Sequence, residues 1–382
     1  MSELIIVTDL NWSRRTVLST LAVTTFGGCV GRSGDKSDEN SGNNEEKTLS
    51  TFWEYQLPGR AGTLSVDDET AFVAGTTYED GDDGSTGHVL ALDRTNGQRQ
   101  WQVEDVGEGI PFGPYLTDSI LVVVNDAGTV FGIDVNDQER RWSTSVTATP
   151  TTRPFAGQNT LYVGYDDGLR VVNPATGDVE TTFETEYGID FAAGANRAYV
   201  GSHRPTSGET VVQAVGDGGA TWTRRFDTTD VGGIVPTVDR VFVTAGRKLV
   251  ALSPDSGETL WSTAVGPTVG EPAVTGGSVH VATRDGIGAY LRENGDERWT
   301  AAIDGGAATS PAVGKEYLFV GADGEIRAFA ADTGDPVGKA NFKDCRLTTR
   351  PTISENRAFV GNFEERSTGY DGRIYSFDVA PK

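Results

Sequence analysis

Short apolar runs alternate with turn-forming residues along most of the chain. Examples are Leu121–Val124, Val241–Val243 and Leu318–Gly321, each with Gly, Asp, Asn or Ser within four residues on both sides. Runs of this length, bounded by residues that favour tight turns, are typical of β-strands and too short for helices. The pattern predicts an all-β protein built from many short strands.

One stretch recurs in related forms. Ala251–Trp261 reads ALSPDSGETLW and Ala91–Trp101 reads ALDRTNGQRQW, so Ala is followed by Gly and then by Trp at the same spacing. The residues around the Gly predict a tight turn between two strands, because Gly tolerates a positive φ. A buried indole removes roughly 150–250 Å² from water, which is at most about 4–6 kcal/mol of stabilisation. The Trp of each repeat is therefore expected to hold neighbouring repeats together.

The repeats have a period near 40 residues. The Trp position falls at residues 53, 101, 142, 181, 222, 261, 299 and 338, and the long first gap contains the insertion 76–87. Two of these positions hold Thr181 and Gly338; Phe183 shares a strand face with Thr181 and is a candidate replacement, whereas Gly338 has none. The positions that hold the aromatic residue are Trp53, Trp101, Trp142, Trp222, Trp261 and Trp299. A period of this size with four strands in each unit predicts an eight-bladed β-propeller with four-stranded blades.

The two ends of the chain complement each other. The last unit ends after Ile374–Asp378 without a Trp strand, while Thr51–Leu57 is a Trp strand without the rest of a unit. We expect the N-terminal strand to complete the eighth blade and close the ring, which leaves no open sheet edge between first and last blade.

Charge adds information about the environment. The net charge is −23, the sequence pI is about 4.5, and only 7 of the 32 basic residues are Lys. Such an excess of acid indicates a protein of a halophilic archaeon, since molar salt screens repulsion beyond about 3 Å; the alternative is an ordinary acidic bacterial protein. Nucleic acid is excluded as an expected partner, because no basic patch interleaved with aromatic residues occurs.

The N-terminus predicts export. Arg14 and Arg15 precede a short apolar run to Phe26 that ends in Gly-Gly and Cys29. The run is too short and too rich in Thr for a permanent membrane span. It resembles a twin-arginine signal with a lipoprotein cleavage box, which implies a lipid on Cys29 and attachment to the outer face of the cell membrane. The alternative is a chance Arg-Arg pair before a disordered leader.

The predicted domain organisation follows. Residues 1–28 are a signal peptide, 29–47 an acidic flexible tether with almost no apolar residue, and 48–382 the propeller.

The repeat resembles the tryptophan-docking motif of PQQ-type (quinoprotein) propellers, essentially throughout residues 48–382. This repeat occurs both in quinoprotein alcohol dehydrogenases and in a non-enzymatic lipoprotein of outer-membrane assembly, so the fold leaves the function open. The dehydrogenases hold PQQ against a vicinal Cys pair with Ca²⁺ and an Asp base. Here Cys345 stands alone. The resemblance therefore implies the fold, but no catalytic residue and no cofactor. The sequence gives no support for bound PQQ.

Four other groups of residues have more than one interpretation. Asp80, Asp82 and Asp83 lie in the insertion and suit either Ca²⁺ or, as we expect, a solvated loop. Cys345 has basic neighbours that would lower its pKa, but a free structural Cys is expected. The arginines near unit starts are candidates for binding an anion in the central funnel, although exposed arginines are the default; they are Arg153, Arg204 and Arg350. His88, His203 and His280 lack metal-ligand spacing.

These observations predict a monomeric, membrane-anchored, extracytoplasmic propeller that acts as a non-catalytic binding or assembly module with envelope proteins as partners. Two alternatives remain open: a quinone-dependent dehydrogenase that uses the central funnel, and a secreted ligand sensor.

Overall fold

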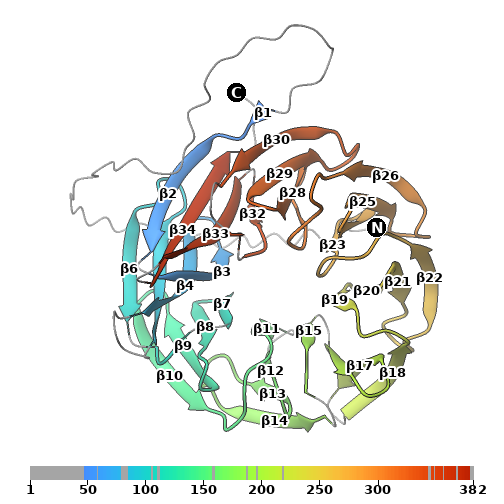
Figure 1. The fold of residues 1–382 in the computed structure, drawn as a ribbon. Helices are drawn as coiled ribbons and strands as arrows, with labels where there is room; N and C mark the ends of the chain where they lie inside the picture. The colour runs from blue at the N-terminus through green and yellow to red at the C-terminus, as the bar shows by residue number, and fades with distance from the viewer. Residues whose placement is uncertain are drawn as a thin grey trace, which may run out of the picture. The chain divides into compact units, whose positions relative to one another are not determined.

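The computed structural model describes residues 47–57, 59–78, 85–104, 106–109, 112–156, 160–185, 188–194, 197–216, 219–342, 346–347, 349–355, 357–366 and 369–378. These residues belong to one compact unit, residues 37–382. They form eight antiparallel sheets arranged as blades around a central axis (Figure 1). Within these ranges there is no helix, and hence none that spans a bilayer. The predicted eight-bladed β-propeller is confirmed.

The first four blades follow the chain in order. Blade 1 contains β3 (Arg60–Val66), β4 (Thr70–Tyr78), β5 (Ser85–Asp93) and β6 (Arg99–Glu104). Blade 2 contains β7 (Phe112–Thr117), β8 (Ile120–Val124), β9 (Thr129–Asp134) and β10 (Glu139–Ser145). Blade 3 contains β11 (Phe155–Ala156), β12 (Leu161–Tyr165), β13 (Gly168–Val172) and β14 (Val179–Glu184). Blade 4 contains β15 (Phe191–Gly194), β16 (Ala198–Arg204), β17 (Glu209–Gly216) and β18 (Gly219–Phe226).

The remaining blades repeat this plan, and the last two recruit N-terminal strands. Blade 5 contains β19 (Val231–Pro236), β20 (Val241–Ala245), β21 (Lys248–Leu252) and β22 (Thr259–Ala264). Blade 6 contains β23 (Ala273–Val274), β24 (Ser278–Thr283), β25 (Gly286–Leu291) and β26 (Glu297–Ala302). Blade 7 contains β27 (Ala312–Val313), β28 (Tyr317–Ala322), β29 (Glu325–Ala330), β30 (Pro336–Asn341) and β1 (Lys47–Thr48). Blade 8 contains β31 (Arg346–Leu347), β32 (Thr352–Ser354), β33 (Arg357–Arg366), β34 (Gly369–Asp378) and β2 (Thr51–Leu57).

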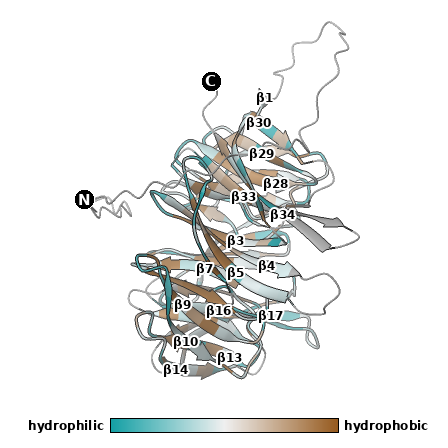
Figure 2. Cartoon of the chain, turned by 90° about the vertical axis from the view of Figure 1, so that its left-hand side faces the viewer, coloured by the Kyte–Doolittle hydropathy of each residue, from teal (hydrophilic) through white to brown (hydrophobic). Residues whose placement is uncertain are grey.

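Burial explains the arrangement of strands within a blade. The two middle strands are apolar on both faces, as in β8 and β9, because each lies between two neighbouring blades. The outer strand alternates between half-buried and exposed residues, as in β22. The hydrophobic colour in Figure 2 accordingly lies in strands such as β5 and β9. The core is thus a series of apolar layers between blades.

The ring closes through the N-terminal strand, as the sequence predicts. β2 pairs antiparallel with β34, and Trp53 lies opposite Ser376. The same strand contributes to the layer between blades 8 and 1, where Trp53 packs with Phe359 and Leu64. Both ends of the propeller are therefore held in one sheet.

A second N-terminal strand covers the Gly338 position, which the sequence left without a replacement. β1 pairs in parallel with β30, with Lys47 opposite Gly338. The Leu49 N–H donates a 2.8 Å hydrogen bond to the Lys339 carbonyl. The Leu49 side chain joins the cluster of Phe319 and Phe342 and is only 9% exposed. The first described strand begins at the last residue of the expected tether.

Candidate functional site

Five Trp side chains each lock one blade to the next. Each indole N–H donates to a backbone carbonyl in the neighbouring turn between third and fourth strands, at 2.8–3.2 Å. Each ring also lies on the Gly of that turn, where an added Cβ would meet ring carbons at 2.4–2.6 Å. The pairs are Trp53 with Gly97, Trp142 with Gly177, Trp222 with Gly257, Trp261 with Gly295 and Trp299 with Gly334. These Gly residues are required both for positive φ and for close approach of the indole.

The sixth Trp has a different neighbour. Trp101 is half-buried and packs on Phe72, with ring centroids 5.9 Å apart. The facing turn of blade 2 has Gln138 at φ 61° where the other turns have Gly. In the described ranges, the hydrogen bond made by the other five indoles is not found for Trp101. This blade contact is therefore the least regular of those that keep a Trp.

The three histidines lie in separate blades. His280 packs beneath Trp299 at a centroid distance of 5.8 Å, the place that Phe or Tyr takes under four other Trp rings. Burial lowers the pKa of His280 to about 4, and Arg298 adds to the lowering. Burial also lowers the pKa of His88. These two rings are packing residues, and the residues described here contain no His, Cys, Asp and Glu group able to hold a metal ion.

A groove opens where blade 3 lacks its Trp. Thr181 is exposed, and no described Gly of the β17–β18 hairpin in blade 4 contacts an indole; an added Cβ at Gly219 would meet nothing within 4 Å. Phe183 is half-buried and packs on a cluster that contains Val215, so it fills the contact in part. A groove of about 400 Å³ remains. This blade 3–4 groove is lined by Thr182, Phe183, Glu184, Thr185, Gln213, Val215, Gly219 and Ala220.

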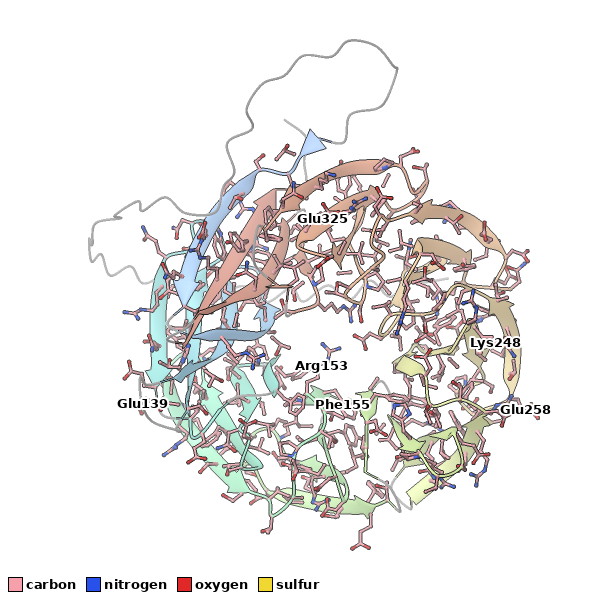
Figure 3. The ribbon with its side chains drawn as sticks, viewed as in Figure 1. Glu139, Arg153, Phe155, Lys248, Glu258 and Glu325 are labelled. Atoms are coloured by element: carbon pink, nitrogen blue, oxygen red, sulfur yellow. The ribbon has the colours of Figure 1, made fainter. Side chains whose placement is uncertain are left out.

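A larger cavity lies on the propeller axis. It has a volume of about 500 Å³ and is lined by the innermost strands of six blades, together with the residues that precede them. Its apolar wall includes Tyr115, Phe155, Val274 and Val313. Figure 3 shows Arg153 projecting into the opening at the centre of the ring, with Phe155 beside it. We call this space the axial cavity.

Two arginines meet one carboxylate at this axis. Arg153 Nη2 lies 2.9 Å from Glu271 Oε1, and Arg350 Nη1 bonds the same oxygen. Burial lowers the pKa of Arg350, Glu271 opposes that shift, and Arg153 adds to it. Burial raises the pKa of Tyr115, and Arg153 partly opposes this. The local charge is +1, opposite in sign to that of the whole protein.

The axial group brings together two of the arginines that the sequence singled out. Arg204 ends β16 and is not among the residues that line the axial cavity. Glu271 was missed by sequence reasoning, although a signal exists: Arg153, Glu271, Ser310 and Arg350 each precede a Pro at the same repeat position. Equivalent positions of a closed ring face the axis, so this spacing identifies the group.

Other sequence candidates lie outside the described residues. These are Arg14, Arg15, Cys29, Asp80, Asp82, Asp83 and Cys345. The described residues at the axis do not fit a calcium-bound quinone. Glu271 is the acidic side chain that contacts the two arginines, and both already bind it, so it is a poor calcium ligand. The vicinal Cys pair is also missing from the sequence.

Comparison with protein families matches residues 85–188 and 207–382 to the family described as outer membrane protein assembly factor BamB. Comparison with curated proteins gave no match. Three solved structures share the fold. BamB from Moraxella catarrhalis has a TM-score of 0.64 at 16% identity, over 86% of this chain and 100% of that one. The computationally designed Ika8 protein has a TM-score of 0.69 at 14% identity, over 87% of this chain and 99% of that one. Quinohemoprotein alcohol dehydrogenase from Comamonas testosteroni has a TM-score of 0.63 at 13% identity, over 89% of this chain and 78% of that one.

Proposed function

Because the chain belongs to the BamB family of outer membrane protein assembly factors, we propose that it is a non-catalytic, extracytoplasmic module that binds an extended segment of another envelope protein. The family supports protein binding in the envelope. The observation that carries the proposal is the pair of blade edges without a Trp. One of these, in blade 7, is covered by β1, and on the other, in blade 3, no described strand pairs with the outer edge.

Blade 7 provides the template for this binding. At Gly338 the chain lays β1 in parallel on the outer strand and inserts Leu49 into the blade contact. Adding a strand to an exposed sheet edge satisfies its free backbone groups, and an inserted side chain provides specificity. At Thr181 the outer strand β14 has no further strand paired with it among the described residues, and it lies beside the blade 3–4 groove. An extended segment from a partner fits this edge as β1 fits blade 7.

The charge of β14 defines the chemistry of the partner. Glu180 and Glu184 are exposed on this strand, and Phe183 offers an apolar surface between them. A complementary segment carries an apolar residue for the groove and Lys or Arg on either side. Opposite charges placed across paired strands stabilise the pairing by roughly 0.2–1 kcal/mol each.

The test is photo-crosslinking in membranes of the source organism. A photoreactive residue at position 182 is compared with one at position 262, the same repeat position of blade 5. We expect position 182 alone to cross-link an extended, basic segment of an envelope protein. Glu180→Lys with Glu184→Lys should abolish the product, whereas Glu139→Lys with Glu258→Lys, on the outer rim elsewhere (Figure 3), should not. Equal cross-linking at both positions, or insensitivity to charge reversal, argues against the proposal.

Anchoring forms a separate part of the proposal. We infer that residues 1–28 are removed as a twin-arginine signal, that Cys29 carries the lipid, and that residues 29–47 tether the propeller 48–382 to the outer face of the membrane. The support is the residue pattern Arg14, Arg15 and Cys29. Cys29→Ser should move the protein from the membrane fraction to the medium, while Cys345→Ser should leave it membrane-bound. Unchanged fractionation of Cys29→Ser would refute lipid anchoring.

The dehydrogenase alternative has one observation in its favour, the fold likeness to quinohemoprotein alcohol dehydrogenase. A fold at this identity hosts more than one function. The axial residues do not fit the quinone with its calcium. Addition of PQQ and Ca²⁺ followed by dye reduction from alcohols tests this alternative directly, and we expect no turnover.

A further inference from the structure

We propose that the axial cavity is a binding site for an organic carboxylate, with the carboxylate against Arg350 and Arg153 and an apolar group against Tyr115 and Phe155. The site is separate from the blade 3–4 groove, and neither proposal depends on the other. The argument rests on the charge at the axis, on how that charge is held, and on the shape and lining of the cavity.

The guanidinium groups retain donors for a ligand. Each guanidinium carries five N–H donors in a planar fork that matches a carboxylate. Glu271 Oε1 accepts from both, so one oxygen serves two cations. The side chain of Arg153 is 53% exposed and that of Arg350 is 35% exposed, and both line the axial cavity. A second carboxylate can therefore bind without displacing the first.

Glu271 is fixed as a counter-charge. Its backbone N–H donates to Ser310 Oγ at 3.1 Å, from the loop before blade 7. On the other side Gly233 of blade 5 approaches so closely that an added Cβ would lie 2.6 Å from Glu271 Cβ. The carboxylate is thus held between neighbouring blades and keeps the arginines in place without a ligand. Two cations share one anion at the wall of the cavity, so one positive charge is left without a partner and a further anion is stabilised there.

The remainder of the cavity selects an organic anion over an inorganic one. A volume of about 500 Å³ lies within the usual range of roughly 300–1,000 Å³ for small-molecule sites. About half of the exposed wall is apolar, and residues such as Phe155, Val274, Val313 and Ile353 provide it. An inorganic anion would leave this wall in contact with water. A carboxylate attached to an apolar body uses both parts of the site.

Two sources supply this chemistry, a free small carboxylate and the C-terminus of a peptide. The probes are 3-phenylpropanoate and a short peptide that ends in Phe, each compared with its neutral amide by isothermal titration calorimetry. We expect saturable binding of the acids and at least about tenfold weaker binding of the amides, since a hydrogen bond to a charged group contributes 1.5–3 kcal/mol. Tighter binding of the peptide acid identifies a chain terminus as the ligand, and tighter binding of the free acid identifies a small molecule.

Two variants separate ligand binding from a structural role. Arg350→Gln should weaken 3-phenylpropanoate binding by about tenfold or more. Glu271→Gln should strengthen binding, because the internal competitor loses its charge. Arg153→Gln provides the same test as Arg350→Gln if that variant fails to fold, and Arg224→Gln, exposed on β18, is the control for loss of a charge far from the axis. An absence of saturable binding to the wild type, equal binding of acid and amide, or a shift of both axial variants in the same direction would overturn the proposal.

Discussion

The indole of Trp53 lies against Gly97, so the first Trp of the chain fastens the last blade to the first. Its ring N–H donates to the Arg94 carbonyl at 2.9 Å, and its backbone pairs with β34. A single residue thereby joins the N-terminal strand, the C-terminal strand and the first docking turn. The ring closes through the same contact that holds neighbouring blades together elsewhere.

The stability of the ring should depend on residues 47–57 far more than on the preceding segment. Removal of residues 1–46 is expected to leave the free energy of unfolding nearly unchanged, whereas removal of residues 1–57 should lower it steeply. Trp53→Ala alone should lower it by about 3–5 kcal/mol, as for other buried Trp residues. Urea denaturation followed by tryptophan fluorescence measures each value. Identical midpoints for the two truncations would show that closure by β2 contributes little.

Gly97 should tolerate no side chain. Its φ is 73°, and an added Cβ would lie 2.6 Å from the Trp53 ring. Gly97→Ala is expected to destabilise the protein by at least the 1–3 kcal/mol typical of backbone strain, because the indole must also move. The matched control is Gly276→Ala, where an added Cβ meets nothing within 4 Å. Similar melting temperatures for the two variants would contradict the docking role of Gly97.

The fold was predictable from the sequence because neighbouring blades, including the last and the first, are joined by the same contact between a Trp and a turn glycine. Trp101, Trp261 and Trp299 each lie four residues after the turn glycine that receives the preceding Trp, and a regular period of this kind specifies blade number as well as strand order. The irregular position is consistent with this contact: blade 3 has Thr181 in place of Trp, and no described Gly of the β17–β18 hairpin in the next blade contacts an indole.

The candidate sites were less predictable because they depend on contacts between distant residues. Glu271 meets Arg153 and Arg350 only after the ring has closed, and no local pattern marks an ion pair between blades. The pairing of β1 with β30 at Gly338 could not be predicted from the sequence either, since β1 has only two residues and therefore no hydrophobic periodicity. Sequence reasoning singled out only the arginines of the axial group, although the shared position before Pro also pointed to Glu271.

Acid should destabilise the protein partly through His280. The folded-state pKa of His280 is lowered to about 4 from 6.5, so the unfolded state binds more protons between these values. The stability from the neutral ring is complete above pH 6.5 and is lost as the pH falls towards 4, by on the order of 3 kcal/mol. His280→Phe, which installs the ring that other blades use at this position, should flatten this part of the pH–stability curve. A variant curve as steep as that of the wild type would exclude His280 as the cause.

Lowering the salt concentration should destabilise the propeller. The net charge of −23 is spread over a protein whose outer rim carries exposed acids such as Glu139 and Glu258 (Figure 3). Their mutual repulsion is screened within about 3 Å at 1 M salt but extends about 30 Å at 0.01 M. The ion pairs at blade contacts, such as Arg94 with Glu355, predict the opposite trend, because salt weakens exposed pairs. Whether stability falls or rises when salt is removed therefore shows whether charge repulsion or the ion pairs dominate.

We expect repulsion to dominate, since the acidic residues outnumber the basic ones by 55 to 32. The melting temperature should fall as KCl is dialysed away. Glu139→Gln with Glu258→Gln should reduce that fall while leaving the melting temperature in molar KCl nearly unchanged, because neither side chain is buried. Potassium chloride is the appropriate salt, since sulfate would strengthen apolar burial independently of charge. A melting temperature that stays constant or rises on desalting would show that the acidic surface is no adaptation to high salt.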